Sequence, residues 1–296
     1  MRYLPELFDL SGRVAVVTGG AGLLGAEFCQ TLMGAGASTI IADINEAAAQ
    51  ELAASLNAQQ INEPEASQNP NRALAVHVDV SAKESVQNLI EIARAEFGQL
   101  DILVNSAALD PKFGDQRNPD LNASGDSDGI SNPVSVNFEE YPLELWNQAL
   151  EVNLTGMFLC CQATGRQMIQ QGGGVIINVS SIYGLVGPDQ RIYQRDGDQP
   201  KFKPAYYSVT KAGVLGLTSY LATYYAGKNI RVNALTPGGV CDKHDDKFLD
   251  AYAARTVMGR MAEKDEMNGA LLFLASNASS YMTGGNLVVD GGWTTW

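Results

Sequence analysis

VAVVTGGAGLLG, residues 14–25, is the stretch of sequence that decides the fold. Its first five residues predict a short buried strand, because all are apolar or β-branched. The glycines that follow let the backbone turn tightly before a helix that is expected to run to about Ala35. A strand, a glycine-rich turn and a helix in this order are typical of a loop that holds a phosphate group at the helix N-terminus.

Apolar runs and helical segments alternate along the rest of the chain. The expected strands are Val14–Thr18, Thr39–Ala42, Ala73–Val78, Ile102–Val104, Val175–Val179, Ile230–Leu235 and Leu287–Val289. The further expected helices are Glu46–Leu56, Ala82–Phe97, Leu143–Gln170, Ala205–Ala226 and Asp265–Ala275. Continuously apolar strands are buried on both faces. We therefore predict a doubly wound α/β fold: a parallel, Rossmann-like sheet of about seven strands, with helices on both faces, in a single domain over residues 1–296.

Three polar segments interrupt this rhythm, at residues 57–72, 110–141 and 184–204. The first is interpreted as a surface loop. The other two follow the carboxyl ends of strands, where the ligands of open α/β sheets bind. Because loops of this length are often functional, we expect these two to cover a substrate.

Composition excludes several classes of partner. The 296 residues carry a formal net charge of −13, which disfavours nucleic acid and anionic membranes. Residues 1–10 contain acids and a proline and do not predict a signal peptide, and no apolar run is long enough for a membrane span, so a cytoplasmic location is expected. With two histidines and four cysteines that form no C-x-x-C pair, no metal site is predicted.

The glycine-rich turn and an acidic residue together predict a dinucleotide site. Gly20, Gly22 and Gly25 fit the pattern G-x-G-x-x-G, and Asp43 ends the second strand. A carboxylate there can accept hydrogen bonds from both hydroxyls of an adenosine ribose. It would repel a 2′-phosphate, which favours NAD over NADP. The alternative is a glycine turn and a capping aspartate without a ligand. The expected cofactor contacts in this region are Gly19, Gly22, Leu23, Leu24, Gly25, Asp43 and Ile44.

Tyr207 and Lys211 are four residues apart and share one face of a predicted helix. A phenol with a pKa near 10 is a weak base at neutral pH, and a nearby ammonium is expected to lower that pKa. Tyr207 could then exchange a proton with an alcohol or a carbonyl, while Ser181 donates a hydrogen bond to the same substrate oxygen. The alternative for the pair alone is two exposed helical side chains.

In addition to these residues, several motifs stand in a characteristic order. They are Asp79-Val80, Asn105-Ser106-Ala107-Ala108, Val152-Asn153-Leu154-Thr155-Gly156, Ser181, Tyr207-Ser208-Val209-Thr210-Lys211, Pro237-Gly238 and residues 280–292 (SYMTGGNLVVDGG). Together they resemble the compact, single-domain branch of the short-chain dehydrogenase/reductase family. The resemblance implies NAD-dependent hydride transfer at a CH–OH group, with Asn153, Ser181, Tyr207 and Lys211 as catalytic residues.

The resemblance implies further roles. Lys211 would reach the hydroxyls of the nicotinamide ribose, and Asn153 would hold a water that relays protons to it. The implied cofactor contacts beyond the glycine loop are Asp79, Val80, Asn105, Ala107, Tyr207, Lys211, Pro237, Gly238 and Val240. Asp79 could instead cap the following helix. Leu23 is a departure from the family pattern, because it stands where the compact branch usually has its middle glycine.

The substrate is expected to be a small, polar, carbohydrate-derived secondary alcohol or ketone. The two long segments contain the basic residues Lys112, Arg117, Arg191, Arg195, Lys201 and Lys203. Of the residues there, Arg191 and Tyr193 are the predicted substrate contacts, although solvated loop side chains are the alternative for each. A 3-oxoacyl-carrier-protein reductase and a non-catalytic dinucleotide-binding sensor are the alternative functions. Asp43 and the net charge argue against the first, and the intact catalytic residues argue against the second. The helices at 143–170 and 205–226 predict a homotetramer.

Overall fold

The computed structural model describes residues 3–61, 71–110, 137–194 and 201–296. One sheet contains seven strands in the order β3-β2-β1-β4-β5-β6-β7, and every neighbouring pair is parallel. The strands are β1 (Val14–Thr18), β2 (Ser38–Asp43), β3 (Ala73–His77), β4 (Ile102–Asn105), β5 (Gly174–Val179), β6 (Ile230–Pro237) and β7 (Asn286–Val289). The predicted doubly wound parallel sheet is confirmed.

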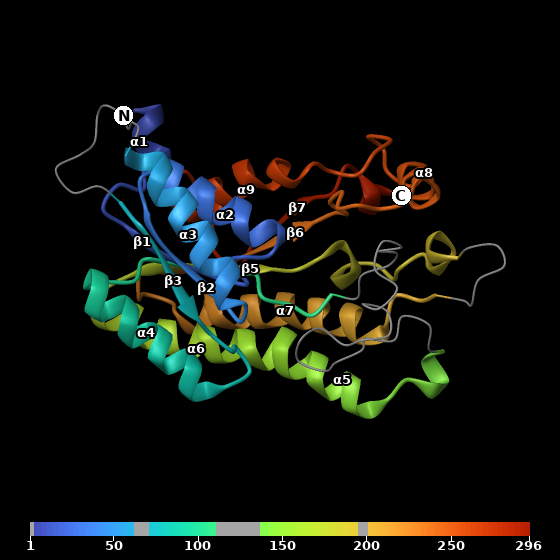
Figure 1. Cartoon of the computed structure of the whole chain (residues 1–296), viewed down its shortest axis with the longest axis horizontal. Coiled ribbons are helices and arrows are strands. Elements are labelled where there is room, and N and C mark those ends of the chain that lie inside the picture. The colour runs from blue at the N-terminus through green and yellow to red at the C-terminus, as the bar shows by residue number, and fades with distance from the viewer. Residues whose placement is uncertain (1–2, 62–70, 111–136, 195–200) are drawn as a thin grey trace.

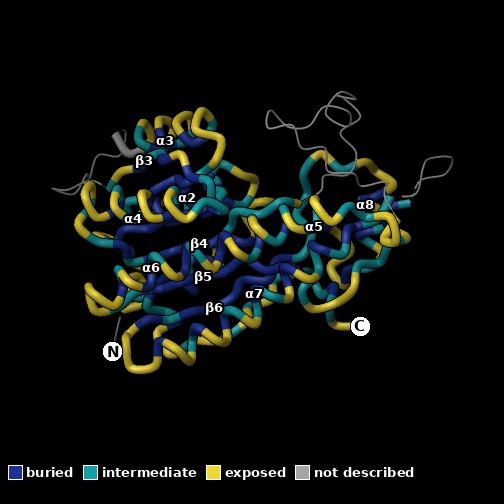
Figure 2. The backbone as a smooth tube through the Cα atoms, turned by 90° about the horizontal axis from the view of Figure 1, so that it is seen from below, coloured by how far each residue is buried: buried dark blue, intermediate teal, exposed yellow. Residues whose placement is uncertain are grey.

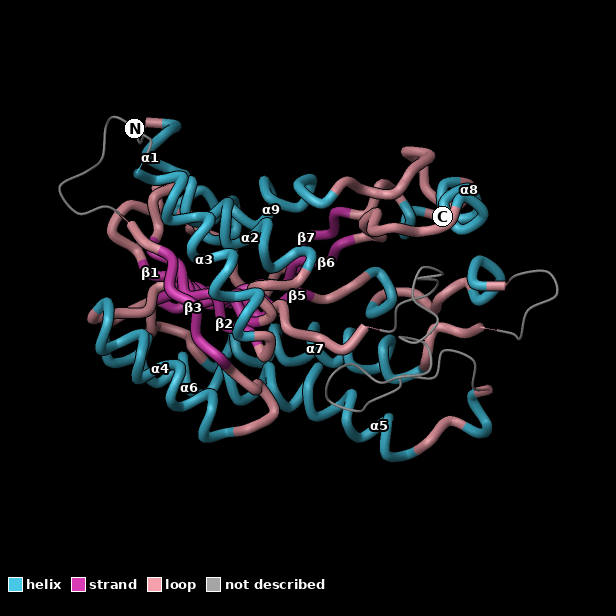
Figure 3. Tube along the Cα trace, viewed as in Figure 1, coloured by secondary structure: helices cyan, strands magenta, loops and turns pink. Residues whose placement is uncertain are grey.

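Helices cover both faces of the sheet, as Figures 1 and 3 show. They are α1 (Leu4–Phe8), α2 (Leu23–Gly34), α3 (Glu46–Ile61), α4 (Lys83–Phe97), α5 (Leu143–Leu150), α6 (Met157–Gln171), α7 (Ala205–Tyr224), α8 (Asp246–Ala253) and α9 (Asn268–Ala275). Helices α2, α3 and α9 pack on one face of the sheet, and α4, α6 and α7 pack on the other. No helix of the described residues combines the length and apolarity that crossing a membrane requires.

The strands are apolar on both faces because each face has its own hydrophobic core. In β1, Ala15 and Val17 belong to the core beneath α2, α3 and α9, whereas Val14 and Val16 belong to the core above α4, α6 and α7. Each fully buried valine or leucine contributes roughly 1.5–3 kcal/mol to folding. The two cores therefore hold the sheet between the helix layers, and Figure 2 shows the central strands β4, β5 and β6 in the buried interior of the molecule.

The first predicted loop begins later than expected. Helix α3 continues to Ile61, so the first five residues of the expected loop at 57–72 are helical. Asn57 explains this extension, because its side chain donates to the carbonyl of Ala73 (2.9 Å) and accepts from the Ala73 amide (2.8 Å). These two bonds tie the end of α3 to the start of β3. Residues 62–70 lie outside the described part of the chain.

The other two segments are described only in part. Of residues 110–141, the structure describes Asp110 and residues 137–141, with a 3-10 turn at Phe138–Glu140. Of residues 184–204, it describes all but 195–200, and Gln190–Tyr193 forms a short 3-10 helix. Lys112, Arg117 and Arg195 therefore lie outside the described residues.

The long helix expected at Leu143–Gln170 is interrupted. Helix α5 passes into a π-helical segment at Glu151–Gly156 before α6 begins. A π-helical turn places one extra residue in each hydrogen-bonded loop and is often found at functional sites. Here the altered turn contains Asn153, one of the predicted catalytic residues.

Candidate active site

The candidate site lies at the carboxyl edge of the sheet. Strand β1 has β2 on one side and β4 on the other, so the chain turns away in opposite directions after β1 and β4. Doubly wound folds bind ligands beyond the strand ends at such a reversal. The glycine-rich turn after β1, Ser181 after β5 and the first turns of α7 all belong to this edge.

The glycine-rich turn is built so closely that side chains would not fit. Gly19 has φ +64°, and a Cβ there would lie 2.8 Å from the Cα of Ala107. A Cβ on Gly25 would lie 2.0 Å from the carbonyl oxygen of Gly19. Gly22 is the N-cap of α2, and its amide donates to the Gly19 carbonyl (3.0 Å). The loop therefore presents bare backbone at a helix N-terminus, which fits a pyrophosphate.

The departure at Leu23 is accommodated on the surface. Leu23 is the first residue of α2, and it is 41% exposed. Its neighbour Leu24 is partly buried and packs against the core beneath α2. A leucine at position 23 thus leaves the close contact between Gly19 and Gly25 undisturbed.

Asp43 is fixed at the rim of the same loop. One carboxylate oxygen accepts from the Ala21 amide (2.9 Å), and the other accepts from the Asn45 amide (2.9 Å). Ile44, beside it, is 56% exposed. The carboxylate is held next to the phosphate loop by backbone donors, and this position fits the diol of an adenosine ribose.

The remaining predicted cofactor residues line the other strand ends. Asp79 accepts from the amide (2.9 Å) and the hydroxyl (2.6 Å) of Ser81, so it shapes the turn before α4, whose N-cap is Ala82. Val80 is buried beside Gly156. Pro237 ends β6, the Gly238 amide donates to Val289 (2.8 Å), and Val240 bridges to Ala262.

Asn105 has a place within the core. It is buried, and its amide nitrogen donates to the side-chain oxygen of Asn178 (2.9 Å) and to the sulfur of Cys161 (3.2 Å). Asn178 in turn donates to the hydroxyl of Thr218 (3.0 Å). The Asn105 side chain therefore joins β4 to β5 and α7. Ala107 is partly buried against the core on the α4, α6 and α7 side, with its amide 3.3 Å from the Thr18 hydroxyl.

Ser181, Tyr207 and Lys211 come together at the end of β5. The Ser181 side chain is close enough to the Tyr207 phenol to lower its pKa, and its Oγ accepts from the Tyr183 amide (3.2 Å). The Lys211 ammonium donates to the carbonyl of Val179 (2.9 Å) and lies 5.7 Å from the centroid of the Tyr207 ring. The predicted pair therefore faces the site and is not an exposed helical pair.

The expected effect on the Tyr207 phenol is wrong for this structure. Burial raises the pKa of Tyr207 well above its usual value, and the negative charge of Asp110 raises it further, while the Ser181 side chain lowers it. Burial also lowers the pKa of Lys211 to about 8, although Asp110 acts in the opposite direction. The ammonium of Lys211 bonds to a backbone carbonyl rather than to the phenol, so burial decides the pKa of Tyr207.

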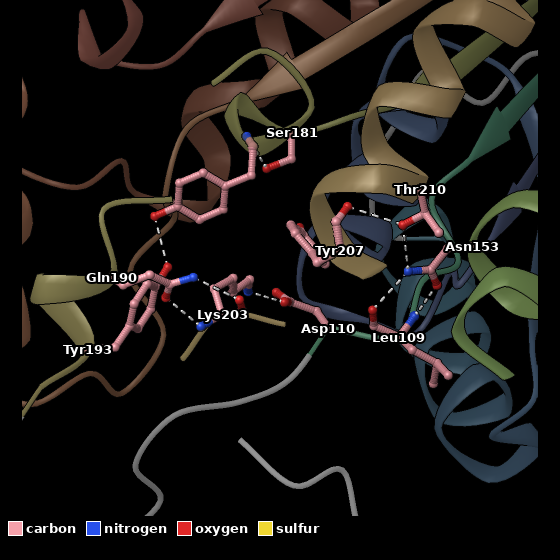
Figure 4. A network of polar contacts seen from close by, with 10 residues as sticks. Leu109, Asp110, Asn153, Ser181, Gln190, Tyr193, Lys203, Tyr207 and Thr210 are labelled. Carbon is pink, nitrogen blue, oxygen red and sulfur yellow. Dashed lines mark hydrogen bonds and ion pairs between the residues drawn. The ribbon is translucent and has the colours of Figure 1, made fainter. Parts of the chain in front are cut away.

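Asn153 fastens the segment after β4 to the π-helical turn. Its side-chain oxygen accepts from the Leu109 amide (2.6 Å), and its nitrogen donates to the Leu109 carbonyl (3.0 Å) and to the Thr210 hydroxyl (3.4 Å). Figure 4 shows these bonds. Asn153 thus connects Leu109 to the helix that carries Tyr207 and Lys211, and the water relay stays a prediction.

The two predicted substrate residues lie in different surroundings. Tyr193 is buried, and its hydroxyl donates to the hydroxyl of Tyr183 (2.8 Å), whose ring meets the Tyr207 ring edge-on at 6.5 Å. Arg191 pairs with Asp189 (2.7 Å), and its side chain is 83% exposed. The structure brings Tyr193 toward the predicted catalytic residues and leaves Arg191 at the surface.

Lys203 is a site residue that sequence reasoning did not single out. It is buried, its ammonium lies 4.1 Å from the centroid of the Tyr207 ring, and it forms an ion pair with Asp110. The sequence shows Lys203 only as one of several loop cations. Its place four residues before Tyr207 was the available signal, because a residue just ahead of a helix lies near that helix's first turn.

Comparison with known proteins defines the class of protein. The short chain dehydrogenase pattern matches residues 13–253. The chain belongs to the short-chain dehydrogenase/reductase family.

Three curated relatives match nearly the whole chain. D-threitol dehydrogenase of Mycolicibacterium smegmatis is 33% identical over 97% of this chain and 95% of the relative. Cis-4-hydroxycyclohexanecarboxylate dehydrogenase of Sinomonas cyclohexanicum is 36% identical over 95% and 96%. Galactitol 2-dehydrogenase (L-tagatose-forming) of Cereibacter sphaeroides is 32% identical over 98% of both chains.

Two solved structures share the fold and contain a dinucleotide. Gluconate 5-dehydrogenase from Burkholderia cenocepacia, in complex with NADP and tartrate, has a TM-score of 0.78 and 29% identity over 99% of this chain and 100% of its own. A short chain dehydrogenase from Leptospira borgpetersenii with bound NAD+ has a TM-score of 0.76 and 28% identity over 99% and 96%.

Proposed function

We propose that this protein is an NAD-dependent oxidoreductase that interconverts a secondary alcohol and a ketone on a small, carbohydrate-derived polyol. The observation that supports this most is that Ser181, Tyr207 and Lys211 come together at the end of β5. The Ser181 side chain lowers the pKa of the Tyr207 phenol, and the Lys211 ammonium lies 5.7 Å from the centroid of the Tyr207 ring. The glycine-rich turn stands at the same edge of the sheet. Two hydroxyls that can meet one substrate oxygen are the proton-transfer part of a dehydrogenase site.

Ser181 and Tyr207 have different roles at the substrate oxygen. Ser181 donates a hydrogen bond to that oxygen and stabilises charge that develops on it. Tyr207 returns a proton to the oxygen during reduction and takes it away during oxidation. When bound, the nicotinamide supplies or accepts the hydride. Lys211 places a positive charge near the Tyr207 ring, and its ammonium is oriented by the Val179 carbonyl.

Asp43 supports NAD as the cofactor. Its carboxylate is fixed beside the phosphate loop by the Ala21 and Asn45 amides. A negative charge in this place accepts hydrogen bonds from a ribose diol and repels a 2′-phosphate. Among the structural neighbours one contains NAD+ and another NADP, so the preference rests on Asp43.

A polyol substrate is favoured by the relatives and by the polar groups around Tyr207. The threitol and galactitol dehydrogenases among the relatives take their names from polyols. In this chain Lys203, Asp110, Tyr183 and Tyr193 supply donors and acceptors close to the Tyr207 ring. Such groups suit a substrate with several hydroxyls.

The proposed assembly is a homotetramer formed through the long helices. Large apolar side chains are exposed along α6 and α7, among them Phe158, Ile169, Tyr220 and Tyr224. Exposed apolar side chains on neighbouring helices support burial against further copies of the chain. The tetramer, the cytoplasmic location and the absence of nucleic-acid or membrane partners stay predictions.

A substrate panel tests the proposal. The purified protein is incubated with NAD+ or NADP+ and with threitol, galactitol, glycerol and a steroid alcohol, and reduction of the dinucleotide is followed by absorbance. We expect the highest kcat/KM with a polyol and NAD+. A higher kcat/KM with the steroid alcohol or with NADP+ would contradict the substrate class or the cofactor, respectively.

A further inference from the structure

We propose that Lys203 and Asp110 form a specificity-determining pair that binds a substrate hydroxyl on the carbon next to the reacting one. The inference rests on the proposed polyol oxidoreductase function and adds two residues to the substrate site. Neither residue belongs to the proton-transfer group of Ser181, Tyr207 and Lys211. The pair would distinguish a vicinal diol from a simple secondary alcohol.

The position of Lys203 is the first argument. Its ammonium lies over the Tyr207 ring, 4.1 Å from the centroid. Figure 4 shows Lys203 between Tyr207 and the short helix that contains Gln190 and Tyr193. Because the ammonium is this close to the Tyr207 ring, an oxygen on the carbon next to the reacting one can come within its reach.

The second argument is the contrast in exposure within the ion pair. The Lys203 side chain is 8% exposed, whereas that of Asp110 is 53% exposed. An ammonium removed from water needs polar partners, and here one partner is a carboxylate that solvent still reaches. An incoming hydroxyl can therefore approach the pair from the Asp110 side without uncovering the lysine.

The charges of the pair select the class of ligand. Lysine donates hydrogen bonds and aspartate accepts them, so the two together match a hydroxyl, which does both. A substrate carboxylate would also be attracted by Lys203, but it would lie beside the negative Asp110. The pair is therefore better matched to a neutral polyol than to a hydroxy acid.

The backbone at Lys203 is positioned independently of its ammonium. The Gln190 side chain accepts from the Lys203 amide (2.8 Å) and donates to the Lys203 carbonyl (3.0 Å). Removing the charged end of the side chain leaves both bonds in place. Lys203→Met should therefore fold with the loop in position, which makes it a usable test variant.

The experiment compares butane-2,3-diol with butan-2-ol, which share a carbon skeleton and differ by one hydroxyl. Lys203→Met should lower kcat/KM for the diol by about tenfold to hundredfold, since hydrogen bonds to charged groups are worth about that much. The value for butan-2-ol should change by less than about twofold. Asp110→Asn keeps a hydrogen-bond acceptor but loses the charge, so it should lower kcat/KM for the diol by less than Lys203→Met does. Lys228→Met, which removes an exposed lysine at the opposite edge of the sheet, is the control and should change neither substrate.

Three results would overturn the inference. Equal losses for the two alcohols would show that Lys203 acts on Tyr207 or on folding. Unchanged kcat/KM values for both alcohols in Lys203→Met would show that Lys203 contacts neither substrate. A larger loss for 3-hydroxybutyrate than for the diol would show that the lysine binds a carboxylate.

Failure of the proposed function is distinguishable from failure of this inference. If the wild-type protein oxidises neither alcohol, calorimetric binding of threitol in the presence of NAD+ decides the matter. Weaker binding by Lys203→Met than by Lys228→Met supports the pair, and equal binding by the two variants overturns it.

Discussion

Replacing Lys211 with methionine should stabilise the ligand-free protein at neutral pH. Lys211 is 5% exposed, and burial lowers the pKa of its ammonium from 10.5 to about 8. At 1.36 kcal/mol for each pH unit, this difference corresponds to about 3 kcal/mol of unfavourable free energy when the buried amine is charged. Methionine has a similar length and carries no charge, so Lys211→Met avoids this cost.

The pH dependence gives the sign of the effect. Below pH 8 the amine is protonated in both the folded and the unfolded chain, and the full cost is present. Between pH 8 and 10.5 the folded protein releases the proton while the unfolded chain keeps it, so wild-type stability rises with pH. The advantage of Lys211→Met should therefore be about 3 kcal/mol at pH 7 and about 1 kcal/mol at pH 9.5.

Urea unfolding followed by circular dichroism measures this advantage. Because wild type and variant share every other titrating group, the difference between them isolates Lys211. Lys228→Met, which removes an exposed lysine, is the matched control variant. A difference that stays constant from pH 7 to pH 9.5, or a variant less stable than wild type at pH 7, would refute the reasoning.

Two further substitutions address the cofactor site. Gly25→Ala should abolish NADH binding in a fluorescence titration, because the new Cβ would lie 2.0 Å from the Gly19 carbonyl oxygen; an unchanged Kd would show that the loop does not hold the dinucleotide. Asp43→Asn should reduce the preference for NADH over NADPH by at least about fivefold, because it removes a charge repulsion worth about 1 kcal/mol or more. A Kd ratio equal to that of wild type would exclude Asp43 as the selecting residue.

Much of the sheet was predictable from sequence because several of its strands are continuous apolar runs. Val14–Thr18 and Ile102–Asn105, for example, are buried throughout, which is the pattern that parallel strands between helix layers require. Helix α8 was missed although the sequence carries a signal for it. Asp245 accepts from the Phe248 amide (2.9 Å) as a helix cap, and Phe248 and Tyr252 are buried on one face of the helix.

Other features depend on tertiary structure. The π-helical turn at Glu151–Gly156 has the composition of an ordinary helix. The structural role of Asn153 can be recognised only from its hydrogen bonds to Leu109. The direction in which the pKa of Tyr207 is shifted also depends on folding. It is determined by burial and by Asp110, which lies almost a hundred residues away in sequence. Pairing such as that of Lys203 with Asp110 leaves no local pattern.

The central claim is that Tyr207 exchanges a proton with the substrate oxygen beside a bound dinucleotide. The most direct measurement is kcat/KM of Tyr207→Phe for the best polyol of the panel, together with its Kd for NADH. The account predicts a loss of at least about a hundredfold in kcat/KM with little change in Kd, since general acid–base catalysis contributes about that much. A variant that retains wild-type kcat/KM while binding NADH normally would contradict it.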